Sequence, residues 1–271
     1  MQGNETMKKE YLTLGIDSGS TTTKAVLFDG KNIVKKAIIA TSANPKESME
    51  RIYKQMYQEE VRYVIATGYG RELLQEADKK VTEITCHAKG AAFLCEEIGA
   101  VIDIGGQDCK AILLDQDQNV IDFLMNDKCS AGTGRFIEVI SRVLGQKVET
   151  ITEFTKGKNP VSISSMCTVF AESEVVSLLA KGEDAGDILL GIIHSICRRT
   201  AIFAQKLPLE GEIFFSGGLA QNEVFQNVLS YYLKKEVKTH ELSQFAGAIG
   251  AAVIGWGKMK KNNSKKKGQS L

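Results

Sequence analysis

Residues 15–29 read GIDSGSTTTKAVLFD, and residues 101–115 read VIDIGGQDCKAILLD. The two stretches align without a gap at a constant offset of 86 residues, which pairs Asp17 with Asp103. Each stretch is a run of β-forming residues that ends in aspartate, turns through small residues and enters a second run. Either copy alone is compatible with an ordinary hairpin, but repetition at one offset indicates a duplicated domain.

Each of the two turns has the composition of a phosphate-binding loop. Glycine allows backbone N–H groups to approach an anion closely, and aspartate holds Mg²⁺ through water. We therefore expect Asp17 and Asp103 to position Mg²⁺ or the attacking water. Phosphate contacts are expected from Gly19, Ser20, Thr21, Gly105 and Gly106. Gln107 either orients that water or binds phosphate, and Lys24 is either a phosphate contact or a surface charge.

The composition is that of a globular protein with one large or two smaller domains. The chain has 271 residues and is 43% hydrophobic, which is enough apolar material for a core. A net charge of +1 gives no general reason to expect a nucleic-acid partner. No apolar run reaches the length of a membrane span, and residues 1–10 lack the apolar core of a secretory signal. We therefore expect a cytoplasmic protein without nucleic-acid or membrane partners.

The expected elements follow one order twice. The first half predicts strands at 11–17, 22–29 and 32–39, a helix at 46–58, a strand at 61–66 and a helix at 86–97. The second predicts strands at 99–104, 109–114 and 119–125, helices, strands near 212–216 and 235–239, and a last helix at 244–257. This order resembles actin-like proteins, sugar kinases and chaperone ATPases. The resemblance implies an α/β, ribonuclease H-like fold of two lobes with a nucleotide in the cleft between them.

The repeat also predicts the domain boundaries. We expect a first lobe over residues 1–97 and a second over 98–257, with a last helix that can pack back on the first lobe. Residues 258–271 read KMKKNNSKKKGQSL, and this basic composition predicts a disordered tail.

A third motif, FFSGGLAQN at residues 214–222, predicts a buried strand, a glycine turn and a helix start. Gly217 and Gly218 would let a flat adenosine pack against the backbone, next to a helix N-terminus. By itself the motif is a plain strand-to-helix turn. Because it follows two phosphate hairpins, we assign it and Gln221 to the nucleotide site.

Two of the six cysteines precede predicted helices. Cys129 lies in NDKCSAGTGRF and Cys167 in SSMCTVFAESEV. A helix N-terminus lowers the pKa of a thiol and favours the thiolate, and Gly132 and Gly134 would let a cofactor approach the backbone. Two thiolates are too few for a four-cysteine iron–sulfur cluster, although a two-fold dimer would supply four. The alternative is a pair of unliganded buried thiols.

The other four cysteines fit different roles. Cys95 and Cys197 are predicted within helices, where cysteine packs as a small hydrophobic residue. Cys86 stands beside His87 and its role is left open, as is that of Cys109 after the second turn. The chain has no CxxC pair, which disfavours a self-contained zinc or cluster site.

Six segments together resemble the ATPase activators of 2-hydroxyacyl-CoA dehydratases, a family that includes the ATPase subunits of benzoyl-CoA reductases. These segments are ATGYGR, ITCHAKGA, VIDIGGQD, NDKCSAGTGRF, SSMCTVFAESEV and SGGLAQN. The resemblance implies a homodimer with one [4Fe–4S] cluster, held by Cys129 and Cys167 of each subunit. It further implies Mg²⁺ and ATP/ADP as cofactors, ferredoxin or flavodoxin as electron donor, and an iron–sulfur dehydratase or related CoA-ester reductase as the partner that receives single electrons.

Two other functions share the expected fold. A small-molecule kinase would need a substrate pocket and a base near the γ-phosphate, and the chain shows no distinct insertion for one. A cytoskeletal or chaperone-like nucleotide switch would need neither. Both alternatives predict a protein without iron.

Overall fold

The computed structural model describes residues 11–127, 132–164 and 168–268. The chain is α/β, with two sheets and helices packed on them. Within the described ranges, no helix is both long enough and apolar enough to cross a membrane.

The chain divides into two compact units, each with one five-stranded sheet and one copy of the repeated hairpin. The first unit comprises Met1–Gly90 and Gly247–Leu271, and the second comprises Ala91–Ala246. The boundary between the two lobes was expected after residue 97. The observed division falls seven residues earlier and groups the last helix with the first unit.

The first unit has the strand order β3-β2-β1-β4-β5. Its elements are β1 Leu12–Ser18, β2 Thr22–Phe28, β3 Ile33–Ala40, α1 Pro45–Met56, β4 Val61–Gly68, β5 Lys79–Lys80, the first part of α2 Glu83–Leu94, and α8 Ala246–Gly268. The strand β1 pairs with β2 antiparallel and with β4 parallel. The predicted three-strand meander is thus confirmed, and its first strand is the centre of the sheet.

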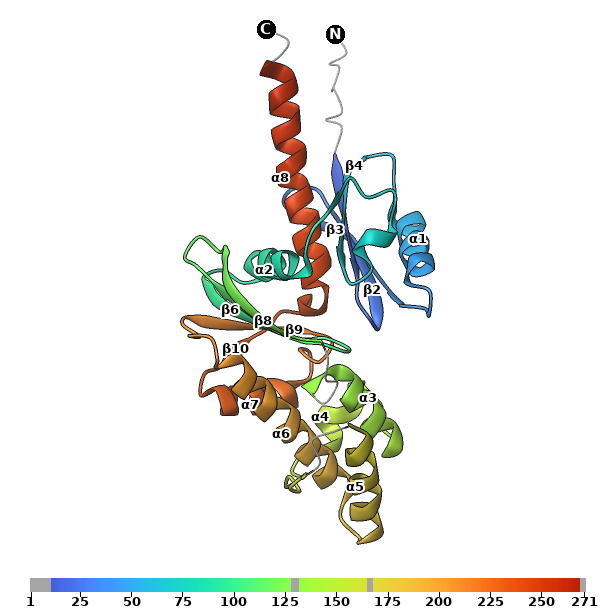
Figure 1. The fold of residues 1–271 in the computed structure, drawn as a ribbon, viewed down its shortest axis with the longest axis vertical. Coiled ribbons are helices and arrows are strands. Elements are labelled where there is room, and N and C mark those ends of the chain that lie inside the picture. Colours follow the sequence, from blue (N-terminus) through green and yellow to red (C-terminus); the bar gives the residue numbers. More distant parts are fainter. Residues whose placement is uncertain (1–10, 128–131, 165–167, 269–271) are drawn as a thin grey trace, which may run out of the picture. The chain divides into compact units, whose positions relative to one another are not determined.

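Side chains of β1 alternate between two helices on opposite faces of the sheet. Leu14 and Ile16 belong to a buried cluster with Met49 and Ile52 of α1. On the other face, the Thr13 hydroxyl donates to the carbonyl of Ala252 in α8 at 2.8 Å. Figure 1 shows this sheet between α1 and α8. The alternation places Asp17, an odd-numbered residue, on the α8 side at the end of the strand.

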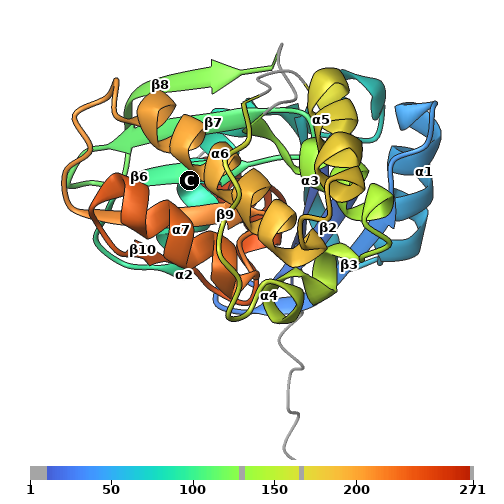
Figure 2. The same cartoon turned by 90° about the horizontal axis from the view of Figure 1, so that it is seen from below.

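The second unit repeats the arrangement with the order β10-β9-β6-β7-β8. Its elements are β6 Ile98–Ile104, β7 Cys109–Leu114, β8 Val120–Asn126, α3 Gly134–Val143, α4 Ile151–Phe154, α5 Thr168–Ala180, α6 Ala185–Ala204, β9 Glu212–Gly217, α7 Glu223–Leu233 and β10 Val237–Lys238. Figure 2 shows α6 and α7 lying across one face of this sheet. In both units the aspartate of the repeat faces the lysine of the repeat across the hairpin, as Asp17 faces Lys24 and Asp103 faces Lys110.

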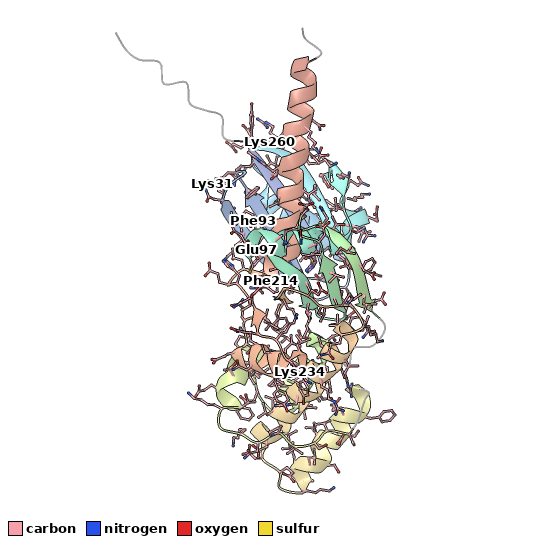
Figure 3. The ribbon with its side chains drawn as sticks, turned by 90° about the vertical axis from the view of Figure 1, so that its left-hand side faces the viewer. Lys31, Phe93, Glu97, Phe214, Lys234 and Lys260 are labelled. Carbon is pink, nitrogen blue, oxygen red and sulfur yellow. The ribbon has the colours of Figure 1, made fainter. Side chains whose placement is uncertain are left out.

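The core of the second unit lies between its sheet and its helices. Ile192 and Ile196 of α6 and Phe136 of α3 are completely buried there. Phe215 of β9 belongs to this cluster, whereas Phe214, labelled in Figure 3, is completely buried outside it. The helix α6 begins where the sequence supplies an N-cap, because the side chain of Asp184 accepts hydrogen bonds from the first N–H groups of the helix.

The end of the chain corrects the sequence analysis. A helix ending near residue 257 and a disordered tail were expected, but α8 continues to Gly268. Lysine is a good helix former, and Met259 is buried, so packing continues past the predicted end. The ammonium group of Lys260, labelled in Figure 3, lies 5.5 Å from the centre of the Trp256 ring. A basic composition therefore did not prevent this segment from being helical.

Candidate functional site

The first turn of the repeat, residues 19–21, joins β1 to β2 and is partly exposed. The N–H of Gly19 donates to the carbonyl of Thr22 at 3.1 Å, which closes the hairpin. The hydroxyl of Thr41 donates to the Gly19 carbonyl at 2.8 Å. Ser20 is exposed and Thr21 is half-buried. Hydrogen bonds thus fix the turn, and the phosphate contacts expected of Ser20 and Thr21 stay a prediction.

Asp17, at the end of β1, is only 6% exposed and is surrounded by glycine. A Cβ atom on Gly68 would lie 2.5 Å from Asp17 Oδ1, and one on Gly247, at the start of α8, would collide with Asp17 Oδ2. The Nε2 atom of His87 lies 3.9 Å from the same oxygen. Sequence reasoning missed His87 as a neighbour of Asp17. The only feature of the sequence that pointed to His87 was its place in the ITCHAKGA segment.

Replacing Gly247 should test this packing directly. Gly247→Ala should lower the free energy of unfolding by about 1–3 kcal/mol, because the new methyl group must displace Asp17 and His87. The matched control is Gly257→Ala in the same helix, where a Cβ meets nothing within 4 Å. That variant should gain about 0.5–1 kcal/mol from the better helix propensity of alanine. Urea unfolding measures both, and equal effects of the two substitutions would contradict the packing described for Asp17.

Asp103, the counterpart of Asp17, is 2% exposed, and its carboxylate contacts Ser216 and Lys110. The hydroxyl of Ser216 donates to Asp103 Oδ1 at 2.7 Å. The ammonium group of Lys110 lies 3.2 Å from Asp103 Oδ2 and also contacts the carboxylate of Asp108. Because Lys110 is itself buried, its charge needs both carboxylates. The orientation of Asp103 is therefore fixed by an ion pair on one oxygen and a hydrogen bond on the other.

This arrangement brings the second and third motifs together. Strands β6 and β9 are parallel neighbours, and their register places Asp103 opposite Ser216 of the SGG sequence. The sequence analysis included neither Lys110, Asp108 nor Ser216 among the site residues. The sequence did contain an indication for Lys110, because this residue repeats Lys24 at the constant offset. Ser216 had only its position in the third motif.

The second turn is hydrogen-bonded to the start of α3. The N–H of Gly105 donates to the Asp108 carbonyl at 2.9 Å. The N–H groups of Gly134 and Arg135 donate to the carbonyls of Gly105 and Gly106, each at 2.8 Å. The turn and the helix that follows Cys129 are thus one hydrogen-bonded structure.

Two other predicted residues near this turn have open surroundings. Gln107, at its tip, is exposed. A Cβ on Gly132 would meet nothing within 4 Å.

In the third motif the two glycines have different surroundings. Gly217 has φ +99°, and a Cβ there would collide with the carbonyl of Ile104, so the turn requires glycine. A Cβ on Gly218 would meet nothing within 4 Å, and Gly218 is exposed. The space beside Gly218 is therefore open, and its contact with adenosine stays a prediction. The side-chain amide of Gln221 donates to the carbonyl of His240 at 2.6 Å, so one of its donors is already used.

The cysteines fall into three groups. Cys129 and Cys167 lie outside the described residues. Burial raises the pKa of the Cys86 and Cys109 thiols to about 12 and also raises the pKa of Cys197, which keeps all three protonated at neutral pH.

Cys95 corrects an expectation. It follows the end of α2 and is partly exposed, rather than packed inside a helix. In the part of the chain that the structure describes, no three His, Cys, Asp or Glu side chains are grouped so as to hold a metal ion.

Comparison with known proteins identifies relatives over nearly the whole chain. Residues 14–255 match the model of the BadF/BadG/BcrA/BcrD ATPase family. The (R)-2-hydroxyglutaryl-CoA dehydratase activating ATPase of Acidaminococcus fermentans is 42% identical, over 92% of this chain and 98% of that protein. The uncharacterized protein YjiL of Escherichia coli is 49% identical, over 90% of this chain and 96% of that protein.

The fold agrees with this match. The structure of the activator of 2-hydroxyisocaproyl-CoA dehydratase from Clostridium difficile, with bound ADPNP, superposes with a TM-score of 0.88 and 35% identity, covering 94% of this chain and 97% of that one. The predicted actin-like class is thereby confirmed.

Proposed function

Because the chain belongs to the BadF/BadG/BcrA/BcrD ATPase family, we propose that it hydrolyses ATP to drive low-potential single electrons into a 2-hydroxyacyl-CoA dehydratase or a related CoA-ester reductase. One observation carries this proposal. The 42% identity to a dehydratase-activating ATPase extends over 92% of the chain, and the family match over residues 14–255 includes both hairpins, the third motif and both cysteine segments. Ferredoxin or flavodoxin would supply the electrons.

The residues of the two turns fit Mg-ATP. Carboxylate oxygens are the ligands that Mg²⁺ prefers, commonly through water. Ser216 contacts one oxygen of Asp103 and Lys110 contacts the other, and these contacts fix the direction of the carboxylate. Asp17 and Asp103 would therefore hold hydrated Mg²⁺, and the backbones of the two turns would bind phosphate. The exposed Gln107 would orient the attacking water, and Gly218 would lie under the adenosine.

Cys129 and Cys167 are the residues best suited to an iron–sulfur cluster. In sequence, α3 begins five residues after Cys129 and α5 begins directly after Cys167. A helix start favours a thiolate, whereas the buried Cys86, Cys109 and Cys197 are held as thiols. Two thiolates per chain would complete a [4Fe–4S] cluster only in a homodimer. When bound, such a cluster would supply single-electron transfer.

The hydrogen bonds between the second turn and α3 offer a route from ATP to Cys129. The Gly105 and Gly106 carbonyls accept from the first N–H groups of α3. A turn that reorganises around phosphate would therefore change the position of this helix start, which follows Cys129 in sequence. For ATP to drive the change, it must bind the two arrangements with different affinity.

The decisive test is iron. Protein purified without oxygen should be brown and contain about two iron atoms per chain, from one four-iron cluster per dimer. Sedimentation should give a dimer. A kinase or nucleotide switch of this fold would contain no iron, so a colourless protein that takes up no iron on anaerobic reconstitution would contradict the proposal. A monomer with four irons would contradict the shared cluster.

A further inference from the structure

A cavity of about 500 Å³ lies in the second unit, and its described lining includes no residue of the two phosphate turns or of SGGLAQN. Ser164, the first residue of the SSMCTVFAESEV segment, lies at one end of it. It is lined by α6, by Tyr232 of α7 and by the extended segment 160–164. The helix contributes three nitrogen-rich side chains to it: His194, Arg198 and Arg199. Among the described residues that line the cavity, none is aspartate or glutamate. Its hydrogen-bonding side chains are therefore those that suit an anion.

The outer wall of the cavity is fixed at both ends. The N–H of Val161 donates to the Asp187 carbonyl at 3.1 Å. A Cβ on Gly191 of α6 would collide with the Val161 carbonyl, so this close approach depends on glycine. At the other end, the N–H and hydroxyl of Ser164 donate to the Glu174 carboxylate at 2.9 and 2.8 Å. The cavity thus has a built wall rather than a loosely placed loop.

The inner side of the cavity has an ordered polar pair. The Nδ1 atom of His194 lies 3.1 Å from the Tyr232 hydroxyl, and the two rings meet edge to face. Burial lowers the pKa of His194 and raises that of Tyr232, while the nearby charge of Arg198 acts against the second shift. An anion placed among these groups would favour the protonated imidazole and balance the arginine charge.

We propose that this cavity binds an organic anion, namely a phosphate or carboxylate group carried on a small apolar body. The volume is in the range of small-molecule sites and larger than one phosphate needs. An arginine guanidinium pairs with phosphate or carboxylate through two parallel hydrogen bonds. Apolar walls for the body of the ligand come from Pro160, Ile163 and Ile202. The described lining includes no residue of the two phosphate turns, so the site is additional to that for ATP.

Three matched probes separate the anion from the apolar body: phenylphosphonate, benzoate and benzyl alcohol. The chain contains three histidines, so ring-labelled histidine gives few NMR signals, and His194→Gln assigns the one that matters. Phenylphosphonate or benzoate should shift the His194 signal saturably and leave those of His87 and His240 in place. Benzyl alcohol should bind at least tenfold more weakly. The stronger of the two anions identifies the preferred group. Saturating ADP should leave this binding unchanged.

Arg198→Gln should weaken binding of the preferred anion by about tenfold or more, since a hydrogen bond to a charged group is lost. Arg142→Gln, near the end of α3, is the matched control because Arg142 and Arg198 are both exposed, and it should bind like the unaltered protein. Both variants should keep the unaltered circular dichroism spectrum. Absence of a His194 shift with either anion, equal binding of benzyl alcohol, displacement by ADP, or unchanged affinity in Arg198→Gln would each overturn the proposal. None of these readouts depends on iron or on electron transfer.

Discussion

Cys129→Ser and Cys167→Ser should each yield a protein that has lost its iron and all activation of its partner. In a dimer with a shared four-iron cluster, one substitution per chain removes two of the four thiolate ligands. Iron is measured by a chelator assay and activation by the turnover of an added dehydratase, both without oxygen. Hydrolysis of ATP should survive at least in part, because the phosphate turns are separate from both cysteines in sequence.

The matched controls are Cys95→Ser and Cys197→Ser, which should keep both iron and activation. Cys95 is partly exposed, so its replacement should be close to neutral. Cys197 is completely buried, and a serine hydroxyl there should cost about 1–3 kcal/mol of stability without loss of iron. A Cys129→Ser protein that retains a full cluster and activates normally would refute the electron-transfer account and favour a kinase-like ATPase.

Asp103→Asn should reduce ATP hydrolysis by at least about 100-fold, while the iron content stays unchanged. The amide keeps the shape of the side chain but removes the charge that would position Mg²⁺ or water. Asp103→Ala should abolish hydrolysis. It should also lower the free energy of unfolding by about 3–5 kcal/mol, because it removes one partner of the buried Lys110. Asp17→Ala should abolish hydrolysis by the same reasoning.

Ser216→Ala is the control for Asp103. It removes one hydrogen bond to the carboxylate and should cost about 0.5–1.5 kcal/mol of stability, with a much smaller fall in hydrolysis than Asp103→Asn. Phosphate release measures turnover, and urea unfolding measures stability. The aspartate variants should still bind nucleotide in part, because backbone groups of the turns also hold phosphate. Turnover near the unaltered rate in both Asp103→Ala and Asp17→Ala would contradict the assignment of the two turns.

The sequence predicted most of the fold because the fold is duplicated and its strands alternate. Every predicted strand of both meanders appears within one residue of its expected start. The hairpin registers of Asp17 with Lys24 and of Asp103 with Lys110 follow from the same pattern. Local chemistry was equally informative at Gly217, where a tight turn requires a positive φ.

The contacts that complete the site are long-range, and no local pattern contains them. Ser216 lies 113 residues from its acceptor Asp103, and His87 approaches Asp17 only because α2 and α8 pack on the same face of the sheet. The extension of α8 to Gly268 was not predicted, because a lysine-rich segment is compatible with both a disordered tail and a helix. The His194 cavity needs an extended segment, two helices and the close approach at Gly191.

The most direct test of ATP-driven electron transfer measures the oxidation of the reduced protein by its partner. The protein is purified without oxygen, chemically reduced, freed of excess reductant and mixed with a 2-hydroxyacyl-CoA dehydratase while its visible absorbance is recorded. Reoxidation should occur quickly only when the dehydratase and Mg-ATP are both present, and Mg-ADP should not replace Mg-ATP. Reoxidation at the same rate without ATP, or a reduced protein that keeps its electron with ATP and every dehydratase tested, would contradict the account.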